Sequence, residues 1–236
     1  MITKSQFKFI KSLFLKKNRI KEQLFIAEGE KIVSELLKSN FEIKNIYATK
    51  EWKVKNDNIT QISNVELQRI SNLKSPNKVL AVVHFKSHKI LENDGVTLAL
   101  DEINDPGNLG TIIRMCDWFG VKQIICSNNT VDIFNPKVVQ SSMGSVFRVQ
   151  VNYTDLENYL SNIKTPIYGA FMLGKNLKEV KLPKSAHLVM GNEANGISAK
   201  INKLITDKVA IKNIGKSAES LNVAVATSIL LHAFCD

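Results

Sequence analysis

Three short polar segments of this chain carry side chains that the packing of a core does not require. They are Asn108–Arg114, Gly191–Ser198 and Ser220–Asn222, and each follows an apolar run. An apolar run of strand length ends where a sheet opens to solvent, so each segment is expected beside a pocket at the edge of a sheet. The planar fork of Arg114 suits a phosphate at such an edge.

The first segment starts with turn residues. Asn104-Asp-Pro-Gly107 is typical of a turn between a strand and a helix, and Asn108 would then cap that helix. This structural interpretation leaves Arg114 unexplained, because it is the single charge in the helical stretch Leu109–Met115. A lone arginine on such a helix must extend to solvent or meet an anion.

The second segment follows the short apolar strand Leu188–Met190. Gly191 allows a ligand to approach the backbone closely. Gly196 allows a second tight turn before Ser198, which is predicted to cap the next helix. Local structure accounts for the two glycines but not for Glu193.

The third segment opens a long apolar helix, which is predicted over Leu221–Phe234. Ser220 is a favourable N-cap for this helix. Asn222 in the first turn is unexpected on structural grounds, because asparagine is a poor helix former.

In this order, the three segments resemble the motifs of the SpoU (TrmH-type) RNA ribose 2′-O-methyltransferases of the SPOUT superfamily. The resemblance covers residues 95–236 and departs from the family at Ala194, which is often glycine, and at Lys212, which is often proline. It implies S-adenosylmethionine as the methyl donor and a ribose 2′-hydroxyl of structured RNA as the acceptor. The catalytic residues that it implies are Asn108, Arg114, Glu193, Ser220 and Asn222. The donor-binding residues that it implies are Met190, Gly191, Asn192, Gly196, Ile211, Ile214, Leu221 and Asn222.

The resemblance also implies a fold and an assembly. We expect an α/β protein whose C-terminal SPOUT sheet contains a deep trefoil knot, preceded by a smaller α/β substrate-binding domain, and we expect a homodimer. Ribosomal RNA is favoured over transfer RNA as the substrate. The alternation of strands and helices independently predicts two α/β modules, over residues 1–93 and 94–236, joined by a polar linker at 86–95.

Two other functions compete with methyl transfer. An RNA-binding protein of the same fold that no longer catalyses would have no need of all five catalytic residues. A dinucleotide-dependent oxidoreductase is disfavoured, because no Gly-x-Gly-x-x-Gly stands between a predicted strand and helix.

Positive charge gathers at the start of the chain. Residues 1–90 contain 18 Lys and Arg against 8 Asp and Glu, whereas residues 91–236 contain 14 of each. Ser5–Arg19 has the apolar spacing of one amphipathic helix with a basic outer face. Such a face binds RNA phosphates or is only solvated, and the three motifs favour RNA. The predicted RNA-binding residues are Lys8, Lys11, Lys16, Lys17, Arg19 and Arg114.

The remaining composition argues against several classes of protein. A hydrophobic content of 44% in 236 residues is that of a globular protein. No apolar run approaches the ~20 residues of a membrane span, and no signal peptide is recognisable, so a cytoplasmic protein is expected. Three cysteines without a Cys-x-x-Cys pair and four scattered histidines predict neither a disulfide framework nor a metal site.

Overall fold

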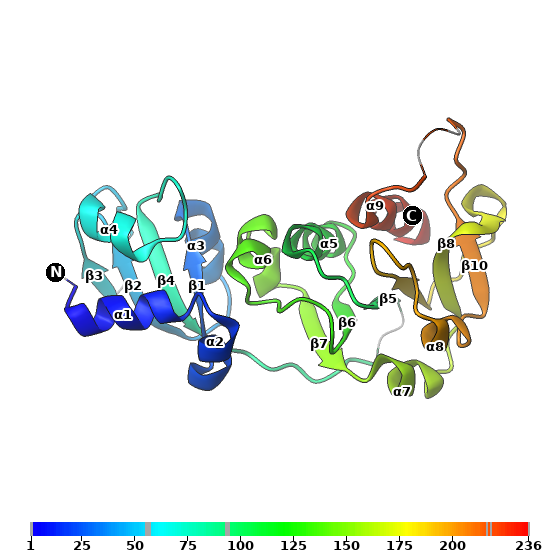
Figure 1. Ribbon diagram of the computed structural model, residues 1–236, viewed down its shortest axis with the longest axis horizontal. Helices are drawn as coiled ribbons and strands as arrows, with labels where there is room; N and C mark the ends of the chain where they lie inside the picture. Colours follow the sequence, from blue (N-terminus) through cyan, green and yellow to red (C-terminus); the bar gives the residue numbers. More distant parts are fainter. Residues whose placement is uncertain (1, 55–57, 93–94, 216, 218, 236) are drawn as a thin grey trace. The chain divides into compact units, whose positions relative to one another are not determined.

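A computed structural model describes residues 2–54, 58–92, 95–215, 217 and 219–235, and the chain divides into two compact units (Figure 1). Unit 1 consists of Met1–Ser87 and Asp132–Phe147, and unit 2 of His88–Val131 and Arg148–Asp236. The predicted boundary between residues 93 and 94 lies outside the described residues. No helix within the described ranges is long and apolar enough to cross a membrane.

Unit 1 is built on a mixed four-stranded sheet in the order β1-β4-β2-β3. Strand β4 pairs antiparallel with β1 and β2, and β2 pairs parallel with β3. The strands are β1 (Leu24–Glu28), β2 (Ile43–Ala48), β3 (Ile59–Gln61) and β4 (Val79–His84). The helices are α1 (Lys4–Ser12), α2 (Lys16–Glu22), α3 (Glu30–Leu37), α4 (Asn64–Ile70) and α6 (Pro136–Ser141), with a 3-10 turn over Ser145–Phe147.

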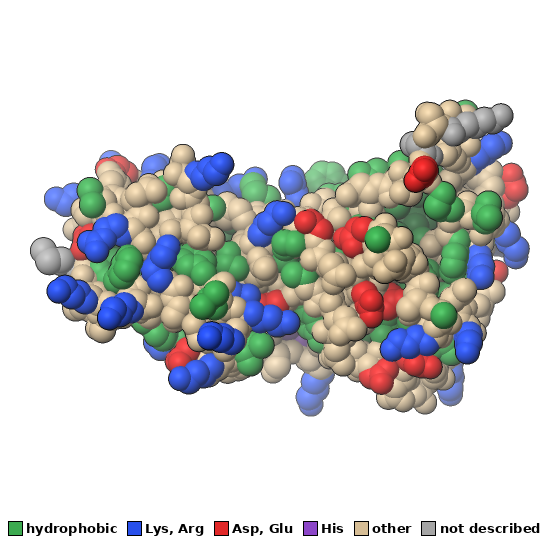
Figure 2. Space-filling view, in the orientation of Figure 1, with side chains coloured by type: hydrophobic (Ala, Val, Ile, Leu, Met, Phe, Trp, Pro, Cys, Tyr) green, Lys and Arg blue, Asp and Glu red, His purple; other side chains and the backbone are tan. Residues whose placement is uncertain are grey.

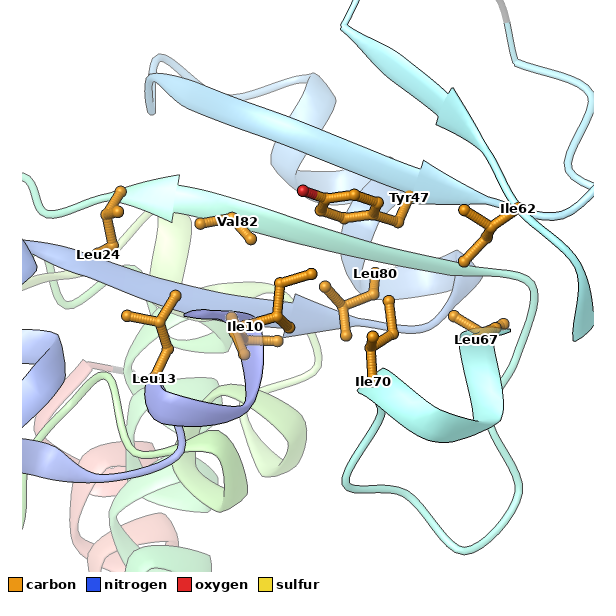
Figure 3. Close-up of a cluster of buried hydrophobic side chains, with 10 residues drawn as sticks. Ile10, Leu13, Leu24, Tyr47, Ile62, Leu67, Ile70, Leu80 and Val82 are labelled. Atoms are coloured by element: carbon orange, nitrogen blue, oxygen red, sulfur yellow. The ribbon is translucent and has the colours of Figure 1, made fainter. Parts of the chain in front are cut away.

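Helices α1 and α4 cover one face of this sheet (Figure 3). Ile10 and Leu13 from the first helix and its C-cap, and Leu67 and Ile70 from α4, meet alternate residues of the strands. Burying such aliphatic side chains stabilises the fold by about 1.5–3 kcal/mol each. The cluster consists of Ile10, Leu13, Leu24, Ile26, Tyr47, Ile62, Leu67, Ile70, Leu80 and Val82.

The prediction of one helix over Ser5–Arg19 is wrong, because the chain breaks between α1 and α2. The Arg19 side chain satisfies carbonyls at the break: its Nη1 donates to Leu13 O at 3.0 Å and to Phe14 O at 2.9 Å. Its Nε and Nη2 donate to Asp132 Oδ2 at 3.1 and 2.7 Å. Arg19 is only 2% exposed, so its predicted role in RNA binding is also wrong. It is a buried structural residue of unit 1.

The segment Asp132–Phe147 completes unit 1, although it lies between elements of unit 2 in the sequence. Besides the Asp132 ion pair, Phe134 stacks on Phe25 with ring centroids 4.4 Å apart and on Phe85 at 4.3 Å. Helix α6 packs against the edge strand β1. Sequence periodicity alone did not indicate that this segment belongs with the N-terminal elements.

Unit 2 contains a six-stranded parallel sheet in the order β10-β8-β9-β5-β6-β7. Helices α5 and α9 lie on one face of the sheet, and α7 and α8 on the other (Figure 1). The strands are β5 (Val96–Leu100), β6 (Gln123–Ser127), β7 (Gln150–Thr154), β8 (Ile167–Asn176), β9 (Ala186–Met190) and β10 (Asp207–Ala210). The helices are α5 (Pro106–Trp118), α7 (Leu156–Ser161), α8 (Ala199–Asn202) and α9 (Val223–Cys235), with a 3-10 turn over Leu177–Glu179.

Candidate active site

The site forms where the strand order of unit 2 reverses. After β5 the chain adds β6 and β7 on one side, and β9, β8 and β10 lie on the other. Leu100 at the end of β5 pairs with Met190 at the end of β9, so the two following loops start side by side. The backbone N–H of Asp101 donates to Met190 O at 2.9 Å. Parallel sheets bind ligands at this kind of reversal, beyond the carboxyl ends of the strands.

The loop after β9 closes on itself. Asn192 and Gly196 exchange two backbone hydrogen bonds of 2.9 Å. A Cβ on Gly191 would lie 2.2 Å from Gly196 C and from Ile197 N, so no side chain fits there without moving the loop. This corrects the expected reason for the glycine: it accommodates the protein's own backbone and need not admit a ligand. Gly196 has φ +68°, as its predicted tight turn requires.

The side chain of Asn192 holds the same loop in shape. Its Oδ1 accepts from the N–H groups of Ala194 at 2.9 Å and Asn195 at 3.1 Å. Its Nδ2 donates to Glu102 O at 2.8 Å, which ties the loop after β9 to the loop after β5. Ala194 has a negative φ, so alanine replaces the family's usual glycine without backbone strain.

Asp101 is a residue of the site that the sequence analysis missed. It is 2% exposed, and its Oδ2 accepts from the Ser198 N–H at 2.7 Å. The Ser198 side chain itself makes no capping hydrogen bond, although Ser198 is the N-cap residue of α8 as predicted. A carboxylate directly after a buried apolar strand was a visible signal, because a buried charge needs donors close by.

A hydrogen-bonded chain joins one residue from each of the three motifs. Asn108 Nδ2 donates to Glu193 Oε1 at 3.0 Å, and Asn222 Nδ2 donates to Asn108 Oδ1 at 2.9 Å. Asn222 Oδ1 accepts from the N–H groups of Ala224 and Val225, which fixes the orientation of its amide. The Asn222 amide in turn fixes that of Asn108, whose N–H group must face the Glu193 carboxylate.

The helix caps differ from those predicted. Asp105, not Asn108, caps α5, and its Oδ1 accepts from the Asn108 N–H at 2.8 Å. Asn222, not Ser220, provides the cap of α9, which begins at Val223. Asn108 therefore lies in the first turn of α5, and Asn222 lies at the cap of α9. The two amides face each other through the hydrogen bond from Asn222 Nδ2 to Asn108 Oδ1. Ser220 is exposed and precedes this turn.

Arg114 lies outside the hydrogen-bonded chain. It follows Asn108 by six residues on α5, which places it about 9 Å further along the helix and about 120° around it. It is exposed and forms no hydrogen bond or ion pair with any described residue. Trp118, one turn later, is 82% exposed. The structure thus brings Asn108, Glu193 and Asn222 together but leaves Arg114 on a separate exposed face.

Some of the predicted donor-binding residues lie at or just beyond the ends of the strands of unit 2. Met190 is buried at the end of β9, and Ile211 is half-buried directly after β10. Ile214 and Leu221 are 82% and 49% exposed, which is unusual for such apolar side chains. Their exposure leaves apolar surface for a ligand such as an adenine ring.

The predicted RNA-binding lysines of unit 1 differ in their exposure and in their contacts. Lys8, Lys16 and Lys17 are exposed and form no ion pair with a residue in the described part of the chain. Lys11 is half-buried and donates to Ser71 O at 3.1 Å. Figure 2 shows Lys and Arg side chains over the face of unit 1 that carries α1 and α2.

Other titratable groups lie away from this site. His187 is 8% exposed in β9 and hydrogen-bonds to the Tyr159 hydroxyl at 2.8 Å and to the Thr165 hydroxyl at 2.7 Å. Burial lowers the pKa of His187 to about 4, so its ring is neutral near pH 7. Burial raises the pKa of the Cys116 and Cys126 thiols, which makes them unreactive. Among the described residues, no three His, Cys, Asp or Glu side chains are grouped so as to hold a metal ion.

Comparison with known proteins gives the same assignment for both parts of the chain. Residues 95–232 match the SpoU rRNA Methylase family, and residues 4–81 match the MRM3-like substrate binding domain. The 23S rRNA (guanosine(2553)-2'-O)-methyltransferase RlmP of Bacillus subtilis is 34% identical over 231 residues, covering 94% of this chain and 92% of that protein.

Two solved structures are similar over nearly the whole chain. A TrmH-family protein from Porphyromonas gingivalis is 36% identical with a TM-score of 0.91, covering 99% of this chain and 98% of that one. An AdoMet-bound rRNA methyltransferase from Sinorhizobium meliloti is 27% identical with a TM-score of 0.88, covering 99% and 95%. The chain therefore belongs to the SpoU rRNA methylase family, and it is an RNA 2′-O-ribose methyltransferase that uses S-adenosylmethionine.

Proposed function

We propose that this enzyme methylates the ribose of a guanosine in 23S ribosomal RNA. The observation that carries the proposal is the chain Glu193–Asn108–Asn222, because it joins all three motifs in one rigid arrangement. A protein that only binds RNA would not need these three side chains to be hydrogen-bonded to one another at the edge of the sheet. The similarity to RlmP over 94% of the chain supports the choice of RNA and of nucleotide.

The reaction needs a ribose hydroxyl that is deprotonated or strongly polarised as it attacks. A guanidinium stays protonated, with a pKa above about 12, so Arg114 is a poor general base. We assign to it the binding of the substrate phosphate, which places the hydroxyl in line with the methyl group. Such positioning alone lowers the barrier by several kcal/mol. Asn108 and Asn222 hold the Glu193 carboxylate in place, and Ser220 lies at the entrance of the same segment.

S-adenosylmethionine supplies the methyl group when it is bound. The residues that fit it are those of the closed loop, Gly191, Asn192 and Gly196, together with Met190 at its base. Ile211, Ile214 and Leu221 offer apolar contacts on the other side. The closed loop presents backbone groups rather than side chains, and this arrangement favours recognition by shape.

The same proposal includes a homodimer. Arg114 and the 82%-exposed Trp118 share one face of α5, and Val225 and Ile229 on the neighbouring helix α9 are also partly exposed. An apolar face beside an unpaired arginine is typical of a subunit interface. We propose that this face joins two copies, so that Arg114 of one copy serves the Glu193–Asn108–Asn222 chain of the other.

Two measurements test these proposals. The purified enzyme, labelled S-adenosylmethionine and unmodified 23S rRNA should give one 2′-O-methylated guanosine, and transfer RNA should give none. No transfer to either RNA would contradict the function, and transfer to another nucleotide would contradict the choice of substrate. The Asn108→Ala variant, which keeps the fold but breaks the hydrogen-bonded chain, is the matched negative control.

The shared site is tested by mixing inactive variants. Arg114→Ala and Asn108→Ala subunits, exchanged at random, form mixed dimers with one intact site, so about a quarter of the wild-type activity should return. No recovery despite verified subunit exchange would show that each copy builds its own site. Trp118→Glu should convert the dimer to a monomer in light scattering.

A further inference from the structure

A cavity of about 210 Å³ lies within unit 1, and none of its lining residues belongs to the three motifs. It opens between the edge strand β1, the segment after α4 and helix α6, which packs against β1. Its walls include Ile26, Glu28, Asn72, Leu73, Val139 and Gln140. Apolar side chains therefore form part of the wall, and polar groups capable of hydrogen bonding form the rest.

Glu28 is the unusual group of this cavity. It is only 6% exposed, and burial raises the pKa of its carboxyl, against the opposing effects of the Ser71 hydroxyl, the Asn72 N–H and Lys11. The Ser71 hydroxyl donates to Oε2, and the Asn72 N–H donates to Oε1 at 3.3 Å. A carboxylate has about four lone-pair sites, so each oxygen can still accept another donor. Glu28 lies outside the three motifs of unit 2.

The size and the chemistry of the cavity restrict its ligand. Pockets for drug-sized ligands measure about 300–1,000 Å³, so this cavity suits one planar ring system rather than a whole nucleotide. Two free acceptor sites on one carboxylate match a ligand edge with two adjacent N–H donors. Guanine presents such an edge through N1–H and the 2-amino group, whereas adenine places an acceptor beside its amino group.

The surroundings point to RNA as the source of that ring. Residues 1–90 hold 18 basic and 8 acidic residues, and Lys8, Lys16 and Lys17 remain exposed. RNA-binding modules commonly take unpaired bases into pockets and read their Watson–Crick edges. We propose that the cavity of unit 1 binds an unpaired guanine of the substrate RNA, with Glu28 accepting from N1–H and the 2-amino group.

This assignment rests on the proposed RNA substrate, but its test measures binding and not methyl transfer, so the two can fail separately. The probe is a fluorescent five-nucleotide single-stranded RNA with one central guanosine among uridines, measured with the full-length enzyme at fixed salt. Inosine at the central position removes only the 2-amino group, and adenosine removes both donors. The wild-type enzyme should bind the guanosine probe at least roughly tenfold more tightly than the inosine probe. It should bind the adenosine probe more weakly than either.

The protein variants separate the carboxylate from general charge. Glu28→Gln should remove most of the preference for guanosine over inosine. Glu22→Gln makes the same charge change on the exposed surface of α2 and should leave the preference intact. Equal binding of the guanosine and inosine probes by the wild-type enzyme would overturn the proposal without any variant. A folded Glu28→Gln protein that keeps the full preference would overturn it as well.

Discussion

Gly191→Ala is the sharpest test of how the loop after β9 supports the reaction. The added Cβ would lie 2.2 Å from Gly196 C and from Ile197 N, and 2.5 Å from Gly196 O. Real Cβ contacts are essentially never shorter than 3.0 Å, so the opposing backbone must retreat by about 1 Å. Glu193 lies in this loop, and its bond to Asn108 measures 3.0 Å, so a displacement of that size breaks it.

A misplacement of about 1 Å can reduce turnover by roughly 100-fold, and we expect that loss for Gly191→Ala. The overpacked loop should also destabilise the fold by about 1–3 kcal/mol. Methyl transfer is measured with labelled S-adenosylmethionine and RNA, donor affinity by calorimetry, and stability by chemical unfolding. Each quantity is compared with the wild-type enzyme.

Gly196→Ala is the matched control in the same loop. Gly196 has φ +68° but no atom within 4 Å of its ideal Cβ, so alanine there adds backbone strain without a collision. A left-handed alanine costs roughly 1–2 kcal/mol, so turnover should fall by no more than about 30-fold even if the whole cost falls on the reaction. Equal losses in the two variants would refute the collision argument. Wild-type turnover in Gly191→Ala would remove the loop's position from the mechanism.

Three further perturbations have defined outcomes. Arg114→Ala should reduce methyl transfer by orders of magnitude, with unchanged donor affinity in calorimetry. Arg114→Lys should also be severely impaired, because lysine lacks the bidentate fork. Near wild-type turnover in the lysine variant would show that the bidentate fork is not required. The His187 pKa is about 4 in the folded protein and 6.5 in a free side chain, so protonation favours the unfolded chain as pH falls from 6.5 toward 4. Between about pH 7.5 and about pH 5, wild-type stability in urea should therefore fall by about 2 kcal/mol more than that of His187→Gln, and parallel pH profiles would contradict this. Reversing the charges of Lys8, Lys16 and Lys17 should lower the slope of log K against log[salt] for RNA binding by up to about one unit for each lysine. The control reverses three exposed lysines of unit 2. An unaltered slope, or an equal effect in the control, would show that Lys8, Lys16 and Lys17 are only solvated.

The elements of unit 2 could be predicted closely because their signals are local. The strand predicted at Leu188–Met190 is the end of β9, and the helix predicted over Leu221–Phe234 is α9 with its start shifted by two residues. The three motifs could be expected at one edge because parallel strands end together. The specific bond between Asn108 and Glu193 could not be predicted, since it depends on the reversal of strand order between β5 and β9.

The errors occurred where tertiary contacts override local patterns. Arg19 looks like part of a basic face in the sequence, but its partner Asp132 lies 113 residues away. Asn222 looks like an unfavourable interior residue, whereas it is the cap, because α9 starts at Val223, two residues later than predicted. The short strand β3 (Ile59–Gln61) carries too few residues for a periodic signal. The deep trefoil knot stays a prediction of the family resemblance.

The packing of Asp132–Phe147 into unit 1 has a consequence for how the chain is made. The ribosome synthesises the chain from the N-terminus to the C-terminus, at about 5–20 residues per second. Unit 1 lacks Asp132 and Phe134 until about 45 residues after Ser87 have been added, a delay of roughly 2–9 seconds. During that interval Arg19 has no carboxylate partner, and Phe25 and Phe85 lack the ring that stacks on both. The N-terminal elements of the nascent chain therefore wait, incompletely folded, for a segment encoded in the middle of the gene.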